Sequence, residues 1–219
     1  MIFFSAILVL ASAVTGAAVN APFESMSLRR SLPDGYVLSN VTWKIPIAPN
    51  GENQTFNGTV QEVFAQLNNA RIRLGLSPLD DPLGISNSTG TTALFSTELL
   101  LRRNHLQKRS YDHTICGVGL QNGADVQRIF EGSTYLTNLK GSCGMNGPRV
   151  CGRISCSWNS AIYWCNDNEG YTEYDCSSFA PYAQIANGLC MFTYHNDLLT
   201  LGQAFTTENF NVIVGSDSC

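Results

Sequence analysis

Two histidines are the residues whose chemistry most directly suggests catalysis. His113 and His195 could serve as the general base and general acid of a small nuclease, with Asp112 or Asp175 orienting one ring. The fold expected below places the two histidines at opposite ends of paired strands. A strand over residues 114–120 would be about 23 Å long, which is too far for two groups that share one phosphate. We therefore expect both histidines to be surface or loop residues.

An acidic loop offers a second kind of catalysis. Residues 167–175 (DNEGYTEYD) contain the carboxylates Asp167, Glu169, Glu173 and Asp175, and a pair of carboxylates can hydrolyse a glycosidic bond. An acidic, aromatic connection between a strand and a helix is more often a solvated loop, however. The sequence contains no Ser-His-Asp motif or glycine-rich phosphate loop either. We predict no enzymatic activity, with a small secreted hydrolase (nuclease or glycosidase) as the alternative.

Aromatic residues are concentrated around one expected hairpin and the loop that follows it. Strand alternation would use half of them for core packing. The remainder could contact a protein or glycan partner, because Trp and Tyr are the residues most enriched at binding hot spots. The set consists of Trp158, Tyr163, Trp164, Tyr171 and Tyr174. We predict that residues 158–174 provide the contact with a partner.

Eight cysteines lie in the second half of the chain. Their even number predicts four disulfides, because small extracellular domains need them and oxidising compartments favour them. The residues are Cys116, Cys143, Cys151, Cys156, Cys165, Cys176, Cys190 and Cys219. Their connectivity cannot be deduced from the spacing. The spacing lacks paired C-x-x-C units, so we expect neither a metal nor a cofactor.

The first 21 residues (MIFFSAILVLASAVTGAAVNA) are typical of a secretory signal peptide, because they are uncharged and apolar and end in small residues. We expect the signal peptide to comprise residues 1–18, so that the protein is secreted to the extracellular space. The apolar core, residues 2–14, is shorter than the roughly 20 residues that span a bilayer. A stable membrane anchor is therefore not expected.

Lys108 and Arg109 form a dibasic pair at the end of a polar segment. In a secreted chain such a pair is a recognition site for a kexin-type protease, whose acidic pocket binds two adjacent cations. We expect a cut after Arg109 that separates a pro-region, residues 19–109, from a mature domain, residues 110–219. The alternative is two domains joined by an uncut basic linker.

Three properties of the chain change at this pair. All cysteines follow it, and all four N-glycosylation sequons precede it. The charge also changes, because residues 22–109 contain 9 Lys+Arg and 7 Asp+Glu (+2) whereas residues 110–219 contain 4 and 10 (−6). The predicted glycosylation sites are Asn40, Asn53, Asn57 and Asn87. The coincidence indicates a glycosylated pro-region followed by a disulfide-rich mature domain.

The composition excludes two classes of protein. The chain is 44% hydrophobic and 14% charged, which is too apolar for a wholly disordered protein. Its net charge of −4 leaves few cations with which to bind nucleic acid or an anionic membrane. We expect an unknown protein or glycan target instead, and a kexin-type protease as the partner during maturation.

The pro-region contains periodic segments of its own. Residues 41–47 alternate like a strand, and Thr59 and Glu62 have the spacing of a capping box that opens a helix. One face of that helix, which Gly75 can end, consists of Val60, Val63, Phe64, Leu67 and Leu74. We predict a strand–helix unit that packs against the mature part during folding.

The mature region alternates between expected strands and helices. The strands are expected at residues 114–120, 149–158, 161–166 and 203–214, and the helices at residues 125–139 and 178–189. The order β-α-β-β-α-β predicts an α+β fold, a split βαβ (ferredoxin-like) sandwich with both helices on one face of an antiparallel sheet. Disulfides worth about 2 to 4 kcal/mol each would contribute much of the stability of so small a domain.

This organisation resembles the killer toxins and killer-toxin-like effectors of fungi. Residues 152–156 (GRISC), 159–167 (NSAIYWCND) and 210–214 (FNVIV) also resemble segments of small secreted proteins of filamentous fungi. The resemblance implies a secreted protein that acts on other cells or on a host by binding, usually without enzymatic chemistry. The acidic charge differs from the basic character of membrane-active toxins and argues against direct lysis.

The dibasic pair generates a first prediction, that secreted protein begins at Ser110. N-terminal sequencing or intact-mass analysis of protein from its native host would identify this end. A Lys108→Ala/Arg109→Ala double variant should leave a longer, glycosylated form in the medium, because the protease recognises both cations. Native protein with residues 22–109 still covalently attached would contradict the prediction.

Overall fold

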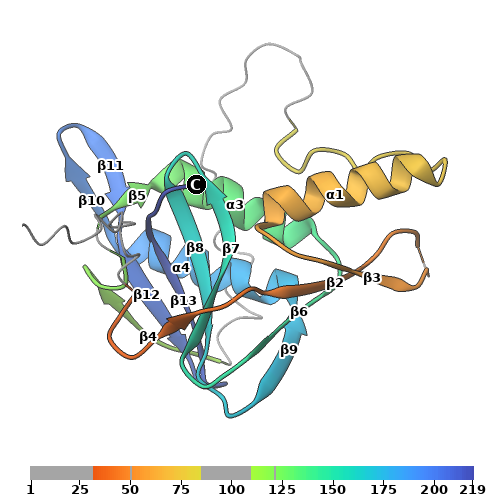
Figure 1. Ribbon diagram of the computed structural model, residues 1–219. Coiled ribbons are helices and arrows are strands. Elements are labelled where there is room, and N and C mark those ends of the chain that lie inside the picture. Colours follow the sequence, from red (N-terminus) through yellow and green to blue (C-terminus); the bar gives the residue numbers. More distant parts are fainter. Residues whose placement is uncertain (1–31, 50, 85–109, 121) are drawn as a thin grey trace, which may run out of the picture.

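The computed structural model describes residues 32–49, 51–84, 110–120 and 122–219 (Figure 1). The expected signal peptide, the Asn87 sequon and the Lys108-Arg109 pair lie outside the described residues. The described chain is mixed α+β and consists mostly of strands, with three α-helices and four disulfides.

A six-stranded sheet forms the centre of the molecule. Its order is β1 (Val37–Leu38), β7 (Val150–Ser157), β8 (Ser160–Asn166), β13 (Phe210–Ser216), β12 (Gly202–Thr206) and β4 (Tyr111–Cys116). The pair of β1 with β7 is parallel, and all other pairs are antiparallel. The two central strands, β8 and β13, are almost entirely buried, which explains their continuous apolar sequences.

Two smaller antiparallel sheets extend this centre. The four-stranded sheet has the order β3 (Asn53–Phe56), β2 (Thr42–Pro46), β6 (Ser142–Asn146) and β9 (Tyr171–Asp175). The three-stranded sheet has the order β10 (Met191–Tyr194), β11 (Asp197–Thr200) and β5 (Ala124–Asp125). The four-stranded sheet therefore takes two strands from residues 32–84 and two from residues 110–219.

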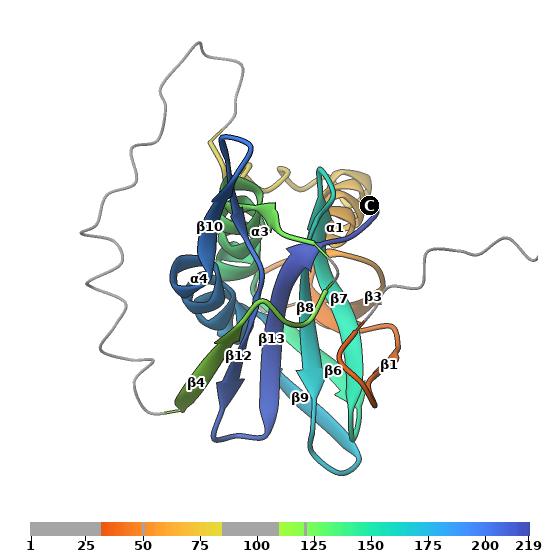
Figure 2. The same cartoon turned by 90° about the vertical axis from the view of Figure 1, so that its left-hand side faces the viewer.

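Three α-helices pack against these sheets. They are α1 (Val60–Arg73), α3 (Val126–Asn138) and α4 (Ala180–Leu189), the last preceded by the 3-10 helix η1 (Cys176–Phe179). Helix α3 packs on β7 and β8, α4 packs on β12 and β13, and α1 contacts both α3 and β7 (Figure 2). The three helices thus form a layer that packs against the central sheet.

Local sequence signals account for the starts of two helices. The capping box predicted for α1 is confirmed, because the Thr59 backbone N–H donates to the Glu62 carboxylate at 2.7 Å. Asp125 caps α3 by accepting a hydrogen bond from the Arg128 backbone N–H at 3.0 Å. Gly132 lies inside α3 because no larger residue fits there: a Cβ at this position would lie only 2.3 Å from Ser155 Oγ on β7. The helix approaches the sheet closely at this point.

The finer expectation of a split βαβ arrangement is not confirmed. Residues 203–214, expected as one strand, form the hairpin of β12 and β13, with Asn209 at a φ of 55° in the turn. Because β13 then pairs with β8, the first strand of residues 110–219, β4, lies at the edge of the sheet. Strands β5, β6, β9, β10 and β11 were also not expected from the sequence.

The main core is built from both halves of the chain. Trp43 and Leu67 belong to the same buried cluster as Ile154, Trp164 and Phe179. The rings of Trp164 and Phe179 stack with their centroids 4.5 Å apart. A second, smaller cluster lies around Tyr163 and contains the half-cystines Cys151, Cys156 and Cys165 with Leu120, Ala161 and Ile213.

The expectation of four disulfides is confirmed, and the structure supplies the connectivity that the sequence left open. The pairs are Cys116–Cys190, Cys143–Cys176, Cys151–Cys165 and Cys156–Cys219. Residues 32–84 contain no cysteine. The disulfides therefore join elements of residues 110–219 to one another and do not reach the first half of the chain.

This pairing predicts the behaviour of the protein under reduction. Four bridges, each formed by loss of two hydrogens, should lower the intact mass by about 8 Da relative to the reduced chain. A Cys143→Ala/Cys176→Ala variant should lose about 2 to 5 kcal/mol in free energy of unfolding, measured by guanidinium titration. Peptide mapping that recovered Cys143 joined to a residue other than Cys176 would contradict the connectivity.

Candidate functional site

The structure does not bring the two histidines together. His113 lies on β4, where its Nδ1 is 2.9 Å from Asp112 Oδ2 and its ring stacks on Phe205. His195 lies in the turn between β10 and β11, with a φ of 48°. That hairpin projects from one end of the molecule, and β4 begins at the opposite end (Figure 2). The two rings cannot act on one phosphate in this arrangement.

The acidic loop is engaged by residues from the first half of the chain. Asp167 accepts hydrogen bonds from the Tyr36 hydroxyl at 3.0 Å and from Asn211 Nδ2 at 2.7 Å. Burial, together with the neighbouring Asp167 carboxylate, raises the pKa of Tyr36 to about 12. Asp167 therefore acts as an acceptor that holds Tyr36 in place.

A second carboxylate of the loop is engaged in the same way. Glu173 forms an ion pair with Lys44 at 2.5 Å and accepts hydrogen bonds from Ser142 Oγ at 2.6 Å and the Tyr171 hydroxyl at 3.1 Å. The hydrogen bond from Lys44 lowers the pKa of Glu173, and the same bond raises the pKa of Lys44. The other two carboxylates, Glu169 and Asp175, are exposed. Asp167 and Glu173, two of the four carboxylates of the loop, are thus held by groups from the first half of the chain.

Two of the five aromatic residues predicted to contact a partner are inaccessible. Tyr163 and Trp164 are fully buried, so the expectation that they form part of a contact surface is wrong for both. The reason is that β8 is covered on both faces. Trp164 packs into the main core and Tyr163 packs into the second cluster, where its hydroxyl donates to the Asp217 carboxylate. Successive side chains of β8 therefore point into two different cores, and neither face of the strand is exposed.

The other three aromatic residues do not form one surface. Tyr174 is half-buried, and its ring packs against Trp164 and Phe210. Trp158 is 79% exposed in the β7–β8 turn, whereas Tyr171 is 48% exposed and follows the opposite end of β8. Trp158 and Tyr171 are therefore separate exposed positions.

The β10–β11 hairpin is an exposed apolar surface that sequence reasoning missed. Tyr194, which is 60% exposed, lies on the same face of the hairpin as the exposed Phe192. Leu198, which is 50% exposed, lies on the other face with the exposed Met191, and Leu189 is exposed at the end of α4. The signal in the sequence was present, because His195 and Asn196 form a two-residue turn with positive φ between two runs of strand-forming residues.

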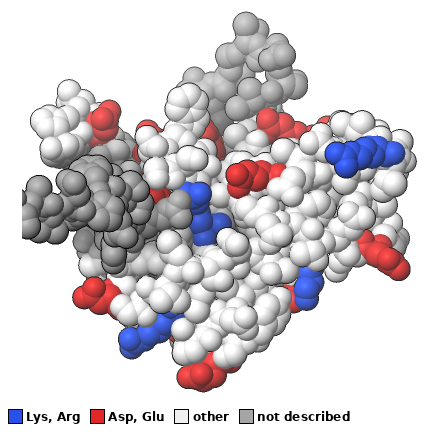
Figure 3. Space-filling model, viewed as in Figure 1, with Lys and Arg blue, Asp and Glu red and all other residues white. Residues whose placement is uncertain are grey.

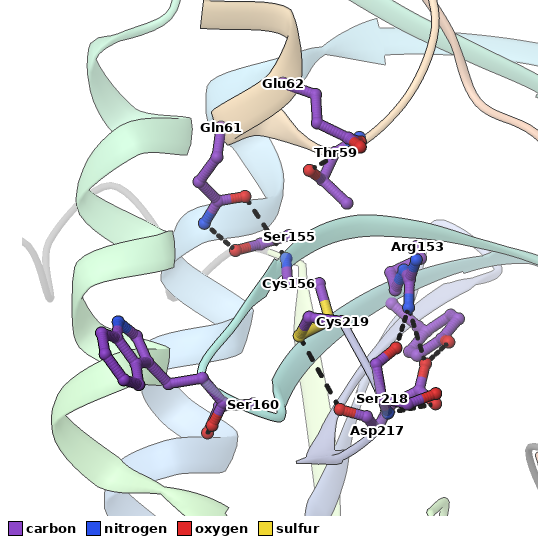
Figure 4. The surroundings of a disulfide bond; sticks show 12 residues. Thr59, Gln61, Glu62, Arg153, Ser155, Cys156, Ser160, Asp217, Ser218 and Cys219 are labelled. Atoms are coloured by element: carbon purple, nitrogen blue, oxygen red, sulfur yellow. Dashed lines mark hydrogen bonds and ion pairs between the residues drawn. A yellow bond between two sulfur atoms is a disulfide. The ribbon is translucent and has the colours of Figure 1, made fainter. Parts of the chain in front are cut away.

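A cleft of about 360 Å³ lies between the two halves of the chain. It is lined by Leu38, Ser39, Asn40, Val41, Gly58, Thr59, Glu62 and Arg153. Its charged groups are already engaged, because Arg153 contacts Asp217 at 3.0 Å and the Ser218 carbonyl at 2.7 Å (Figure 4). The hydrogen bond from the Thr59 backbone N–H lowers the pKa of Glu62. The Glu62 carboxylate and the Arg153 guanidinium of the cleft are therefore both held by neighbouring groups.

Three of the predicted glycosylation sites can be placed. Asn40, Asn53 and Asn57 are all exposed, as attachment of a glycan requires. Glycosylation at these positions stays a prediction. Asn40 also borders the cleft, so a glycan there would extend over it.

The charge of the surface is scattered. Figure 3 shows isolated acidic and basic side chains on one face of the molecule and no continuous cationic patch there. Among the described residues, no three His, Cys, Asp or Glu side chains are grouped as metal ligands. None of the described helices has the length and apolarity needed to cross a membrane.

Comparisons with known proteins found no matching family model, no matching curated protein and no matching solved structure. No known protein or structure therefore indicates the function of this chain by analogy. The evidence from the structure comes from the contacts of the chain's own residues.

The engaged carboxylate Glu173 predicts a pH dependence. Because its pKa is lowered in the folded protein, its interactions stabilise the fold above its unfolded pKa of about 4.3 and are lost as pH falls through the lower, folded value. A Glu173→Gln variant should therefore melt at a lower temperature than wild type at pH 7, and the difference should be smaller at pH 3 than at pH 7. The exposed Glu169→Gln should melt like wild type at both pH values. An equal difference for Glu173→Gln at both would contradict this role.

Proposed function

We propose that this protein is a secreted, toxin-like or effector-like protein that acts by binding a target on another cell or a host. A kexin-type cut after Arg109 would release its disulfide-rich half from covalent attachment to the precursor. The four disulfides support an oxidising compartment, and the signal-peptide pattern and the sequons support secretion. The toxin-like or effector-like part of the proposal rests on the organisation of the sequence, which resembles that of killer-toxin-like effectors.

The exposed apolar β10–β11 hairpin carries the proposal that the protein acts by binding. Large apolar side chains gathered on a projecting element are a mark of interaction sites. The base of this hairpin is held firmly, because Cys190, the residue before β10, is bonded to Cys116 and because β11 pairs with β5. The Thr200 hydroxyl also lies 3.3 Å from the Asn187 carbonyl of α4. A hairpin fixed in this way loses little conformational freedom when it binds.

The side chains of the hairpin favour a protein target over a glycan. Its exposed apolar and aromatic residues, Met191, Phe192, Tyr194 and Leu198, match the apolar centre of a protein interface, and its exposed polar residues, Thr193, His195, Asn196 and Asp197, match the polar rim. Of the residues predicted to contact a partner within 158–174, only Trp158 and Tyr171 are exposed, and they lie apart. The described residues provide no geometry in support of the hydrolase alternative.

A matched pair of variants tests this function. Met191→Ser/Leu198→Ser, which changes two side chains on the same face of the hairpin, should reduce saturable binding of labelled protein to intact fungal and plant cells by tenfold or more, because each side chain contributes about 1.5 kcal/mol when buried at an interface. Circular dichroism and the melting temperature should stay unchanged, since both residues are exposed. The control Trp158→Ser/Tyr171→Ser should bind like wild type. Loss of binding in the control alone would place the contact at residues 158–174, and full binding by the hairpin variant would refute the proposed surface.

A further inference from the structure

Residues 32–84 supply an interior strand to a sheet that they share with the rest of the protein. Strand β2 pairs with β3 on one side and with β6 on the other, and Trp43 is opposite Phe56 and Cys143 in these two pairings. Without β2, the backbone of β6 would have an open edge, which is costly to expose. Residues 32–84 are thus part of the sheet and do not merely cover it.

Apolar side chains of this segment fill the main core. Trp43, Val60 and Val63 are fully buried, and Ile45 and Leu67 are nearly so. They belong to one cluster with residues of α3, β6 and β7 from the second half. The indole N–H of Trp43 is satisfied inside the segment, because Trp43 Nε1 donates to the Gly58 carbonyl at 2.9 Å. The interface therefore resembles the interior of a single domain.

Two glycines of residues 110–219 are shaped to receive the segment. A Cβ at Gly152 would lie 2.2 Å from Val41 Cγ2, and a Cβ at Gly141 would lie 2.5 Å from the Lys44 carbonyl oxygen. Gly141 also has a φ of 141°, which other residues rarely adopt. The second half of the chain thus leaves room for residues 41–45 at the positions where a side chain would exclude them.

Polar contacts fix the register of the segment at several separate places. Gln61 Nε2 donates to Ser155 Oγ at 2.8 Å, and the Cys156 backbone N–H donates to Gln61 Oε1 at 3.3 Å (Figure 4). These two bonds connect α1 to β7 beside the Cys156–Cys219 disulfide. The Lys44–Glu173 ion pair and the Tyr36–Asp167 hydrogen bond attach the same segment to the acidic loop.

From these contacts we infer that residues 32–84 stay bound after cleavage, so that the active protein is a complex of two chains held together without a disulfide. The inference rests on the proposed cut after Arg109. It also assigns an occupant to the acidic loop, because Tyr36 and Lys44 of the chain's own first half hold the loop carboxylates Asp167 and Glu173. The β10–β11 hairpin stays available to a target in the two-chain complex.

A forced cut in the full-length protein tests this inference. Residues 105–109 would be replaced by the recognition site of a sequence-specific protease, and the purified protein would be cut and then separated by size exclusion. The two chains should elute together and give the sum of their masses in native mass spectrometry, and they should separate only in denaturant. Separate elution under native conditions would overturn the inference.

Two glutamines of α1 provide a matched pair of variants. Gln61→Ala should weaken the association of the cut chains about tenfold, because it leaves the buried Ser155 and the Cys156 N–H without their partner. Gln66→Ala should leave the association unchanged, since Gln66 is exposed and bonds only to the Asn57 carbonyl of its own segment. Equal retention of the Gln61→Ala and Gln66→Ala segments would show that these contacts do not hold the two chains together.

The forced cut separates this inference from the processing on which it rests. Native protein that is never cut after Arg109 would contradict the processing alone, provided that the forced-cut chains stay together. Native protein that begins at Ser110 and purifies without residues 32–84 would contradict retention. Loss of cell binding by the hairpin variants bears on neither result.

Discussion

The insertion of β2 between β3 and β6 is the contact on which the rest of the structure depends. It brings the fully buried Trp43 and the α1 helix into the main core. Each buried apolar side chain of this size contributes about 1.5 to 3 kcal/mol of transfer free energy. The net stability of a domain is only about 5 to 15 kcal/mol. A handful of side chains from the first half therefore decides whether the second half has a complete core.

The disulfides and the noncovalent contacts stabilise different parts of the molecule. Cys151–Cys165 joins β7 to β8, and Cys156–Cys219 joins β7 to the end of the chain, so both secure the central sheet. Cys143–Cys176 fixes β6, the strand that receives β2, to the start of η1. The bridges thus hold in place the surface against which residues 32–84 pack. This arrangement allows the chain to be cut between the halves without loss of any covalent cross-link.

Local signals in the sequence were sufficient for elements whose formation depends on neighbours along the chain. The Thr59–Glu62 capping box, the Asp125 cap and the β7–β8 hairpin are of this kind. Strands β6 and β9 could not be predicted, because SCGMN and YTEYD show no clear alternation and are strands only through pairing with β2 and with each other. The burial of Tyr163 was missed because it depends on a second core formed by residues distant in sequence, such as Leu120 and Ile213.

The same long-range pairing determines which surface is available for recognition. The sequence directed attention to the aromatic hairpin and acidic loop, where Trp and Tyr are dense. In the folded chain Lys44 and Tyr36 engage the loop carboxylates, and the ammonium of Lys44 lies 5.7 Å from the centre of the Tyr171 ring. Contacts that would serve a foreign partner thus serve the chain itself. The β10–β11 hairpin differs because its apolar side chains project from a base fixed by Cys116–Cys190. Exposure on a rigid support, and not aromatic density, is the property on which the proposed binding surface rests.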